Sequence, residues 1–225
     1  MLDQEQSQTI GAETDTETFD LVVVGAGIAG LNALFASTGY LPKGARVLLI
    51  DQKSAAGGMW NTAYDYVRLH QPHPMFTVGD LKWDWRKPAD YLAARDEVHE
   101  HLAKSLTPIA SQVSLTTEFG CTVSDCREVE TKDGYRARVT YHPNDAAEDT
   151  RTVLADRAVF ASGLDYRMAA PLPLSCDAVL SIAPGDLSQT LAAHPYARVY
   201  VVGGARPAWT PSLPPCRRTP HERSR

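Results

Sequence analysis

The sequence predicts an α/β fold, a parallel sheet with helices that is extended by a β-hairpin layer. Residues 19–24, which are apolar except for Asp20, lead into a G-x-G-x-x-G turn, after which apolar residues recur at helical spacing. A second apolar run, at residues 46–50, follows a short turn. Residues 128–141 alternate around Asp133-Gly134, which is a strong hairpin signal. Strand, helix and strand in this order predict a parallel βαβ unit at the start of the domain.

The turn at residues 25–30 predicts a Rossmann-like dinucleotide site. Gly25 lets the chain turn sharply, Gly27 lacks the Cβ that would hold a pyrophosphate away from the backbone, and Gly30 lets the helix pack close to the strand. The helix N-terminus then offers free N–H groups and a partial positive charge to the phosphates. The predicted cofactor-binding residues of this turn are Gly25, Ala26, Gly27, Ile28, Ala29 and Gly30.

An acid follows the second predicted strand. Asp51 lies 21 residues after Gly30, and an acid at this distance can accept hydrogen bonds from the ribose hydroxyls of an adenosine. We therefore add Asp51 and its neighbour Gln52 to the predicted site. A glycine-rich turn in some other α/β domain remains the alternative, because G-x-G-x-x-G by itself is a weak signal.

The composition argues against several classes of protein. At 225 residues with 44% hydrophobic content, the chain can bury a core as one large domain or two small ones. A net charge of -5 without a basic cluster before the last residues predicts no nucleic-acid partner. Three glycines interrupt the apolar stretch at residues 21–34, so we predict no membrane span, and the acidic N-terminus does not resemble a signal peptide. We expect a cytoplasmic protein.

Cysteine and histidine spacing gives no metal or dithiol signal. The four cysteines, at positions 121, 126, 176 and 216, form neither C-x-x-C nor a His/Cys ligand pattern, so we expect free thiols. His70 and His73 lie in a proline-containing stretch without a third ligand nearby. We therefore predict no metal site there.

Further elements extend the first domain over residues 19–165. Residues 1–18 are polar, and we expect them to be disordered. An amphipathic helix is predicted from Pro88 to residue 106, with Pro88 at its first position. Short strands are predicted at residues 113–116 and 121–123, before the hairpin, and a buried strand at residues 156–163 after it.

Residues 57–60, Gly-Gly-Met-Trp, come shortly after Asp51. Adjacent glycines permit close backbone approach to a ligand, and a large aromatic ring can close over it. The chain thus has three motifs in order: a G-x-G-x-x-G turn, an acid at the end of the second strand, and G-G-x-W. This order resembles that of the class B flavoprotein monooxygenases, which include flavin-containing and Baeyer–Villiger monooxygenases. The resemblance implies that the first site binds FAD, with Gly58, Met59 and Trp60 along its pyrophosphate and ribityl chain.

The same resemblance assigns roles to three later residues. The loop at residues 64–79, including His70, would run past the flavin ring, where polar groups can tune its electronics. Val123 would present backbone groups to the adenine. The strand at residues 156–163 resembles the segment that closes the flavin domain, here at Gly163.

A second dinucleotide-binding domain is expected to begin in residues 166–204. Residues 197–204 repeat the opening pattern, an apolar run into Gly203 and Gly204, and look like the start of the NAD(P)H-binding fold. The family fingerprint Phe-x-Gly-x-x-x-His is not present in that form. The resemblance is therefore to the broad family rather than to its N-oxygenating branch.

Residues 205–225 depart from the pattern. Residues 206–225 hold five of the chain's 15 prolines together with five arginines, and prolines prevent the helix that should follow a phosphate-binding turn. Shifting the reading frame by one nucleotide upstream permits G-x-G-x-x-G followed by an aspartate. We therefore expect an out-of-frame tail, and a genuine disordered Pro/Arg-rich tail is the alternative.

The resemblance implies the FAD half of an NAD(P)H-dependent monooxygenase that uses NADPH, O₂ and a small-molecule substrate. We expect the chain as written to be inactive, because its NAD(P)H domain is incomplete. A flavoprotein similar to the pyridine-nucleotide disulfide reductases is one alternative, although it requires a redox-active cysteine pair. A non-catalytic, truncated FAD-binding protein is the other.

Overall fold

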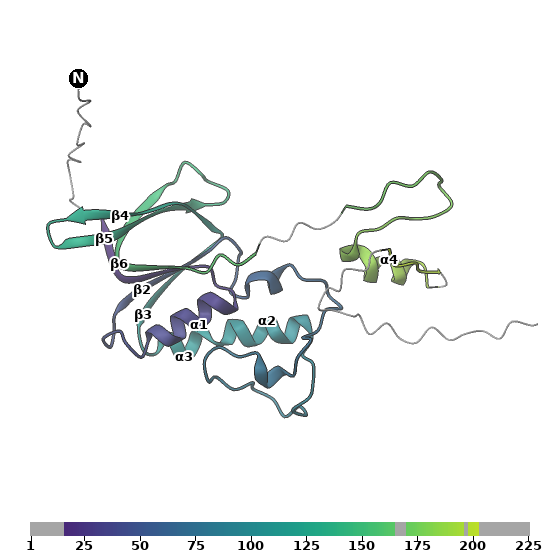
Figure 1. Cartoon of the computed structure of the whole chain (residues 1–225), viewed down its shortest axis with the longest axis horizontal. Helices are drawn as coiled ribbons and strands as arrows, with labels where there is room; N and C mark the ends of the chain where they lie inside the picture. Colours follow the sequence, from purple (N-terminus) through teal and green to yellow (C-terminus); the bar gives the residue numbers. More distant parts are fainter. Residues whose placement is uncertain (1–15, 165–169, 196–197, 203–225) are drawn as a thin grey trace, which may run out of the picture.

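The computed structural model describes residues 16–164, 170–195 and 198–202. Within them lies a six-stranded sheet with the strand order β3-β2-β1-β6-β5-β4 (Figure 1). The strands are β1 (Glu17–Val24), β2 (Arg46–Asp51), β3 (Ser114–Phe119), β4 (Cys121–Thr131), β5 (Gly134–Pro143) and β6 (Arg151–Phe160). The α-helices are α1 (Ile28–Ser37), α2 (Arg95–Lys104), α3 (Leu106–Ala110) and α4 (Leu187–Ala193). Short 3-10 helices are η1 (Gly58–Asn61), η2 (His73–Met75) and η3 (Pro184–Asp186). The predicted α/β class is confirmed.

The four strands β3, β2, β1 and β6 run parallel, with Val22 of β1 opposite Leu48 of β2 and Ala158 of β6. Helices α1, α2 and α3 lie together on one side of these strands (Figure 1). Because the strands are parallel, their carboxyl ends share one edge of the sheet. In folds of this class ligands bind outside that edge.

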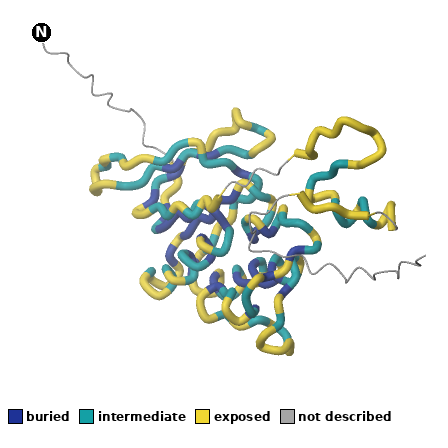
Figure 2. The backbone as a smooth tube through the Cα atoms, turned by 45° about the vertical axis from the view of Figure 1, so that its right-hand side comes forward, coloured by how far each residue is buried: buried dark blue, intermediate teal, exposed yellow. Residues whose placement is uncertain are grey.

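Strands β1 and β2 are buried on both faces of the sheet, which explains their continuous apolar runs. Leu21 and Val23 pack with Leu31 and Leu34 of α1. On the opposite face, the alternate residues of β1 and β2 pack with the hairpin in a second cluster, which includes Val22, Leu48, Ile50, Val139 and Tyr141. Figure 2 shows the buried residues concentrated in the sheet and the helices next to it.

The predicted hairpin is confirmed as the antiparallel pair β4 and β5, which turns at residues 132–133. It joins the parallel strands through β6, whose first half pairs with β5, from Arg151 opposite Tyr141 to Ala155 opposite Ala137. The hairpin curls over the sheet (Figure 1). It is therefore both an extension of the sheet and the layer that covers the face opposite α1.

Strand β1 begins two residues earlier than predicted. Glu17 and Thr18 pair with Val153 and Leu154 of β6, so the expectation of a disordered tail is wrong for these two residues. Pairing with a long neighbouring strand supplies backbone hydrogen bonds that their polar composition did not indicate. Residues 1–15 lie outside the described part of the chain.

Helix α2 begins at Arg95, and the predicted start at Pro88 is wrong. Pro88 belongs to a turn in which its carbonyl accepts a hydrogen bond from the Tyr91 N–H at 3.0 Å. The helix begins where the Glu97 carboxylate accepts the Ala94 N–H at 2.8 Å, a typical arrangement at a helix N-terminus. A proline suits the first position of a turn as well as that of a helix, so the sequence did not distinguish the two.

The predicted strand at residues 197–204 is also wrong for its described part. Residues 198–202 form no strand, and the side chains from Val199 to Val202 are between 46% and 80% exposed. Within the described residues no neighbouring strand pairs with them, and an isolated apolar run has no sheet to complete. The second domain at residues 166–204 remains a prediction. Gly203, Gly204 and the tail from residue 205 lie outside the described residues.

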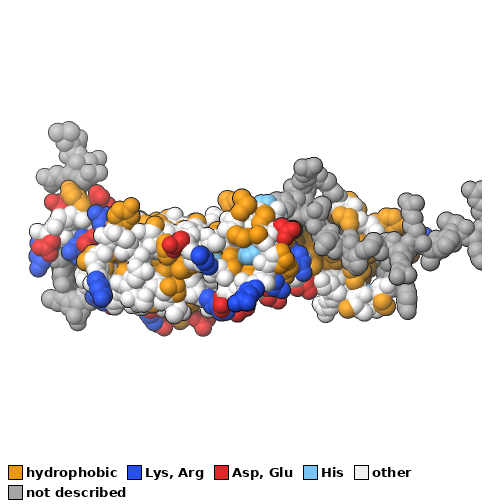
Figure 3. Space-filling model, turned by 90° about the horizontal axis from the view of Figure 1, so that it is seen from below, with side chains coloured by type: hydrophobic (Ala, Val, Ile, Leu, Met, Phe, Trp, Pro, Cys, Tyr) orange, Lys and Arg blue, Asp and Glu red, His pale blue; other side chains and the backbone are white. Residues whose placement is uncertain are grey.

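Acidic and basic side chains are mixed on the surface seen in Figure 3. Lys and Arg lie beside Asp and Glu there and form no continuous basic patch on that face. Among the helices that the structure describes, none is long and apolar enough to cross a membrane.

Candidate functional site

The carboxyl ends of β2, β1 and β6 are joined by backbone hydrogen bonds. The Gly25 N–H donates to the Ile50 carbonyl at 2.7 Å, and the Ala161 N–H donates to the Val24 carbonyl at 2.8 Å. The turn at residues 25–30 therefore starts from a rigid edge, with a neighbouring strand on each side.

Two glycines of this turn are required by the protein's own packing. Gly25 has a φ of +104°, and a Cβ there would lie 2.3 Å from the Ala161 carbonyl oxygen. A Cβ on Gly30 would lie 1.8 Å from the carbonyl oxygen of Gly25. The structural roles predicted for these glycines, a sharp turn and close packing of α1, are confirmed.

Gly27 differs, because the protein leaves room beside it. Its φ of -77° suits any residue, and a Cβ would meet only the Gly58 Cα, at an ordinary 3.5 Å. Gly27 is the N-cap of α1, and no side chain of the described residues caps the helix there. The first N–H groups of an α-helix have no partner within it, and the first turn of α1 contains no acid. This end of α1 therefore suits an anion.

The segment Gly57-Gly58 lies directly against the turn. The Gly57 N–H donates to the Ala26 carbonyl at 2.9 Å. Gly58 has a φ of +54°, and a Cβ on it would lie 2.7 Å from the Gly27 Cα. Two glycine segments about 30 residues apart in sequence thus face each other at the N-terminus of α1. We call residues 25–30 together with Gly57 and Gly58 the glycine cradle.

Asp51 lies at the end of β2 with only 7% of its surface exposed. One carboxylate oxygen accepts the Ala26 N–H at 2.5 Å, and the other accepts the Lys53 N–H at 2.7 Å. Asp51 therefore holds the glycine turn in place, a role that the sequence did not predict. Each carboxylate oxygen can accept a further hydrogen bond, so the predicted contact with a ribose remains compatible with this arrangement.

Comparisons with known proteins support a dinucleotide fold. Residues 23–80 match a family described as an NAD(P)-binding Rossmann-like domain. An uncharacterised protein of Mycobacterium tuberculosis and another of Mycobacterium bovis are 44% identical to the chain over 70 residues. These residues are 31% of this chain and 12% of each relative.

A flavin-containing monooxygenase from Stenotrophomonas maltophilia is 25% identical with a TM-score of 0.50, over 65% of this chain and 38% of that one. The chain is similar to the class B flavoprotein monooxygenases. A cyclohexanone monooxygenase solved with cyclohexanone shares the fold at 21% identity and a TM-score of 0.52, over 68% of this chain and 28% of that one. The chain spans 38% or less of the length of each of these proteins. The resemblance inferred from the ordered motifs is confirmed.

The residues that follow Asp51 lie against the start of β4. The Gln52 carbonyl accepts a hydrogen bond from the Asn144 amide at 2.8 Å, and the Lys53 carbonyl accepts the Gly120 N–H at 2.8 Å. Val123 pairs with Tyr141 immediately before a register shift in the hairpin. Such irregularities free backbone groups from the ladder. The adenine contact assigned to Val123 remains a prediction.

The structure places Trp60 in the core rather than over the cradle. Its side chain is 4% exposed, and its ring packs edge-on against Phe76 with centroids 5.8 Å apart. The neighbouring Met59 side chain, in contrast, reaches the surface and is 48% exposed. The expectation that the Trp60 ring closes over a ligand is therefore corrected. A backbone role for this segment stays a prediction.

His70 and Gly163 are both exposed. Gly163 has a φ of +71°, and no described atom lies within 4 Å of a Cβ built on it, so its backbone conformation is what favours glycine. It follows Ala161, which packs against Gly25 and Gly30. The position of His70 beside a flavin ring remains a prediction.

Asn32 of α1 ties the loop at residues 77–79 to the helix, a contact that sequence reasoning missed. Its amide donates to the Thr77 carbonyl at 3.1 Å and to the Ile28 carbonyl at 2.9 Å. Its oxygen accepts the Gly79 N–H at 2.8 Å. A polar residue inside an apolar helix face was the available signal, because buried polar groups need partners.

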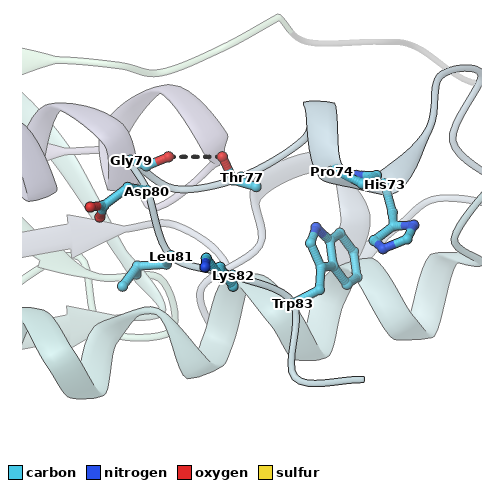
Figure 4. A pocket seen from close by; sticks show the side chains of 8 residues that line it. All are labelled: His73, Pro74, Thr77, Gly79, Asp80, Leu81, Lys82 and Trp83. Carbon is cyan, nitrogen blue, oxygen red and sulfur yellow. Dashed lines mark hydrogen bonds between the residues drawn. The ribbon is translucent and has the colours of Figure 1, made fainter. Parts of the chain in front are cut away.

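A surface hollow of about 490 Å³ is lined by other residues than those of the glycine cradle (Figure 4). It is lined by His73, Pro74, Thr77, Gly79, Asp80, Leu81, Lys82 and Trp83. The imidazole of His73 lies beside the Trp83 ring, with centroids 5.4 Å apart. The hollow is formed by residues of η2 and of the loop that follows it, and none of its lining residues belongs to the glycine cradle.

The His101 ring stacks on Trp83, one of the residues that line this hollow, with centroids 4.0 Å apart and an interplanar angle of 7°. His101 is 8% exposed, and burial lowers its pKa to about 4, with smaller contributions from the nearby charges of His73 and Lys104. His101 is therefore neutral at pH 7 and serves the core.

Proposed function

We propose that this chain is the FAD-binding part of an NAD(P)H-dependent flavoprotein monooxygenase. The observation that carries the proposal is the contact between Gly57-Gly58 and the turn at residues 25–30, beside the open N-terminus of α1. The similarity to a flavin-containing monooxygenase at 25% identity supports it.

The residues of the cradle fit a pyrophosphate. The first-turn amides of α1 can donate to phosphate oxygens, and no acid in that turn opposes the negative charge. Gly27 presents bare backbone without being required by the packing of the protein itself. When bound, FAD supplies the redox chemistry, while the protein binds and orients it. Asp51 would hold the turn and accept the adenosine ribose.

An NAD(P) molecule in the same cradle is the nearest alternative, because the matching family is described as NAD(P)-binding. The G-G-x-W segment favours FAD, since in class B monooxygenases it follows the first turn along the flavin. Titration with both cofactors separates these possibilities.

A disulfide-reductase-like activity is not favoured. Cys121 and Cys126 lie on the same strand five residues apart, about 16 Å at the usual rise of a strand, which is too far for a disulfide. Burial raises the pKa of both thiols, whereas a reactive dithiol needs a lowered pKa.

We also propose that NADPH does not reduce flavin bound to the chain as printed. The sequence carries prolines after Gly204, where a second phosphate-binding helix would be expected, and proline is unfavourable inside a helix. We therefore expect bound flavin to stay oxidised when NADPH is added without oxygen, and rapid bleaching would contradict this. The oxygenase activity, its small-molecule substrate and O₂ belong to an intact enzyme, which we place in the cytoplasm.

The direct test is equilibrium titration of the purified protein with FAD, NAD⁺ and NADP⁺ in parallel. We expect FAD to bind and to give flavin absorbance at about 450 nm in the protein fraction after gel filtration. Binding of NAD⁺ or NADP⁺ without affinity for FAD would refute the proposal.

A further inference from the structure

The Gly57-Gly58 pair is held between two elements. On one side, a Cβ on Gly58 would lie 2.7 Å from the Gly27 Cα. On the other, Gly57 has a φ of +135°, and a Cβ on it would lie 2.7 Å from Cδ2 of His99 on α2. The imidazole of His99 therefore lies against Gly57, as the backbone of Gly27 lies against Gly58.

Asn61 links His99 to the backbone of this segment. Its amide nitrogen donates to the Ala55 and Gly58 carbonyls, both at 3.1 Å. These two bonds use both amide hydrogens, so the side-chain oxygen of Asn61 faces Nε2 of His99 at 3.0 Å. Nε2 must therefore carry the proton and donate it to Asn61. The arrangement fixes the side chains of both residues.

Helix α2 gives this contact a rigid base. His99 follows Val98 and precedes Leu102, whose side chains are fully buried. Arg95, one turn earlier, donates to the Ala63 carbonyl at 3.1 Å and so ties the helix to the same stretch of chain. Contacts with α2 therefore help to fix the position of the glycine pair, in addition to its contacts with the turn that it faces.

We propose that His99 and Asn61 are positioning residues that hold Gly57-Gly58 at contact distance from Gly27 and thereby set the width of the cradle. The inference rests on the proposed function for its cofactor. Without the pair, the hydrogen bond from the Gly57 N–H to the Ala26 carbonyl loses its support and opens more often. A wider cradle then binds the pyrophosphate less tightly.

The first experiment needs no cofactor. Amide hydrogen exchange of Gly57 is measured by NMR in the wild type, Asn61→Ala and His99→Ala, well below the unfolding temperature. Asn61→Ala removes three side-chain hydrogen bonds, and we expect at least about tenfold faster exchange at Gly57. His99→Gln keeps an N–H donor at similar reach and should restore slow exchange. Unchanged exchange in both alanine variants would overturn the proposal.

His101→Gln is the matched control. It changes a histidine of the same helix that stacks on Trp83. We expect this variant to lower the melting temperature while leaving Gly57 exchange and FAD affinity at wild-type values. If it accelerates Gly57 exchange as much as His99→Ala does, the effect comes from general destabilisation and the proposal fails.

The second experiment measures the dissociation constant of FAD in the same variants. We expect Asn61→Ala and His99→Ala each to weaken binding about tenfold, and the double variant to weaken it by less than the product of the two effects, because the two residues share one contact. Faster exchange with unchanged FAD affinity would refute the positioning role. If the wild type binds no FAD, the proposed function fails, whereas the exchange experiment still decides whether the pair holds the glycines.

Discussion

Substituting alanine at Gly27 or at Gly30 should separate ligand binding from folding within one turn. At Gly27 the backbone is extended, and the new Cβ meets only the Gly58 Cα at 3.5 Å. We expect a stability change under about 1 kcal/mol, since a poorer N-cap is offset by a less flexible unfolded chain. At Gly30 the Cβ falls 1.8 Å from the Gly25 carbonyl oxygen, which belongs to the rigid backbone. Relieving that overlap should cost at least about 3 kcal/mol.

Gly27→Ala should have little effect on stability but a large effect on ligand affinity. The methyl group of Gly27→Ala would stand where the pyrophosphate approaches, and an overlap of about 3 kcal/mol corresponds to roughly 100-fold weaker FAD binding. Urea unfolding gives the stability of both variants, and flavin fluorescence titration gives the affinity of Gly27→Ala. A folded Gly27→Ala protein that binds FAD like the wild type would show that the turn has a structural role only.

Two further predictions concern buried groups. Asp51→Asn should lower the free energy of unfolding by about 1–3 kcal/mol, because an amide N–H₂ replaces an oxygen that accepts a backbone N–H; urea unfolding that matches the wild type would contradict this. The second concerns pH: since the pKa of His101 falls from 6.5 to about 4 on folding, the unfolded chain takes up a proton that the folded chain does not. Stability should therefore decrease as the pH falls from 6.5 to about 4, by about 3 kcal/mol from this group. His101→Gln should lack this part of the pH dependence, and identical profiles for the two proteins would refute the assignment.

The sequence predicted an element correctly where the residues that determine it are neighbours in the chain. The φ of Gly25 and the close packing of Gly30 follow from the turn itself, so the strand, turn and helix were predictable from spacing. Continuous apolar runs likewise identified β1 and β2, because both faces of these strands are buried. The alternating pattern around residues 133–134 identified the hairpin for a comparable reason.

It failed where the deciding contact lies far away in sequence. The Trp60 ring was expected to close over a ligand, but it packs in the core against Phe76. The link between Asn61 and His99 joins residues 38 positions apart, and neither has a spacing that marks it. The apolar run that includes residues 198–202 looked like a strand, yet a strand needs a partner, which no sequence window contains.

The central claim, that the cradle holds the cofactor, is tested most directly by following backbone amide resonances while FAD is added to the labelled protein. The account predicts that the largest shifts occur at Gly27, Ile28, Ala29, Gly57 and Gly58, where the turn and the glycine pair meet. Largest shifts at residues 79–83, which line the hollow beside Trp83, or no shifts at saturating FAD, would contradict it.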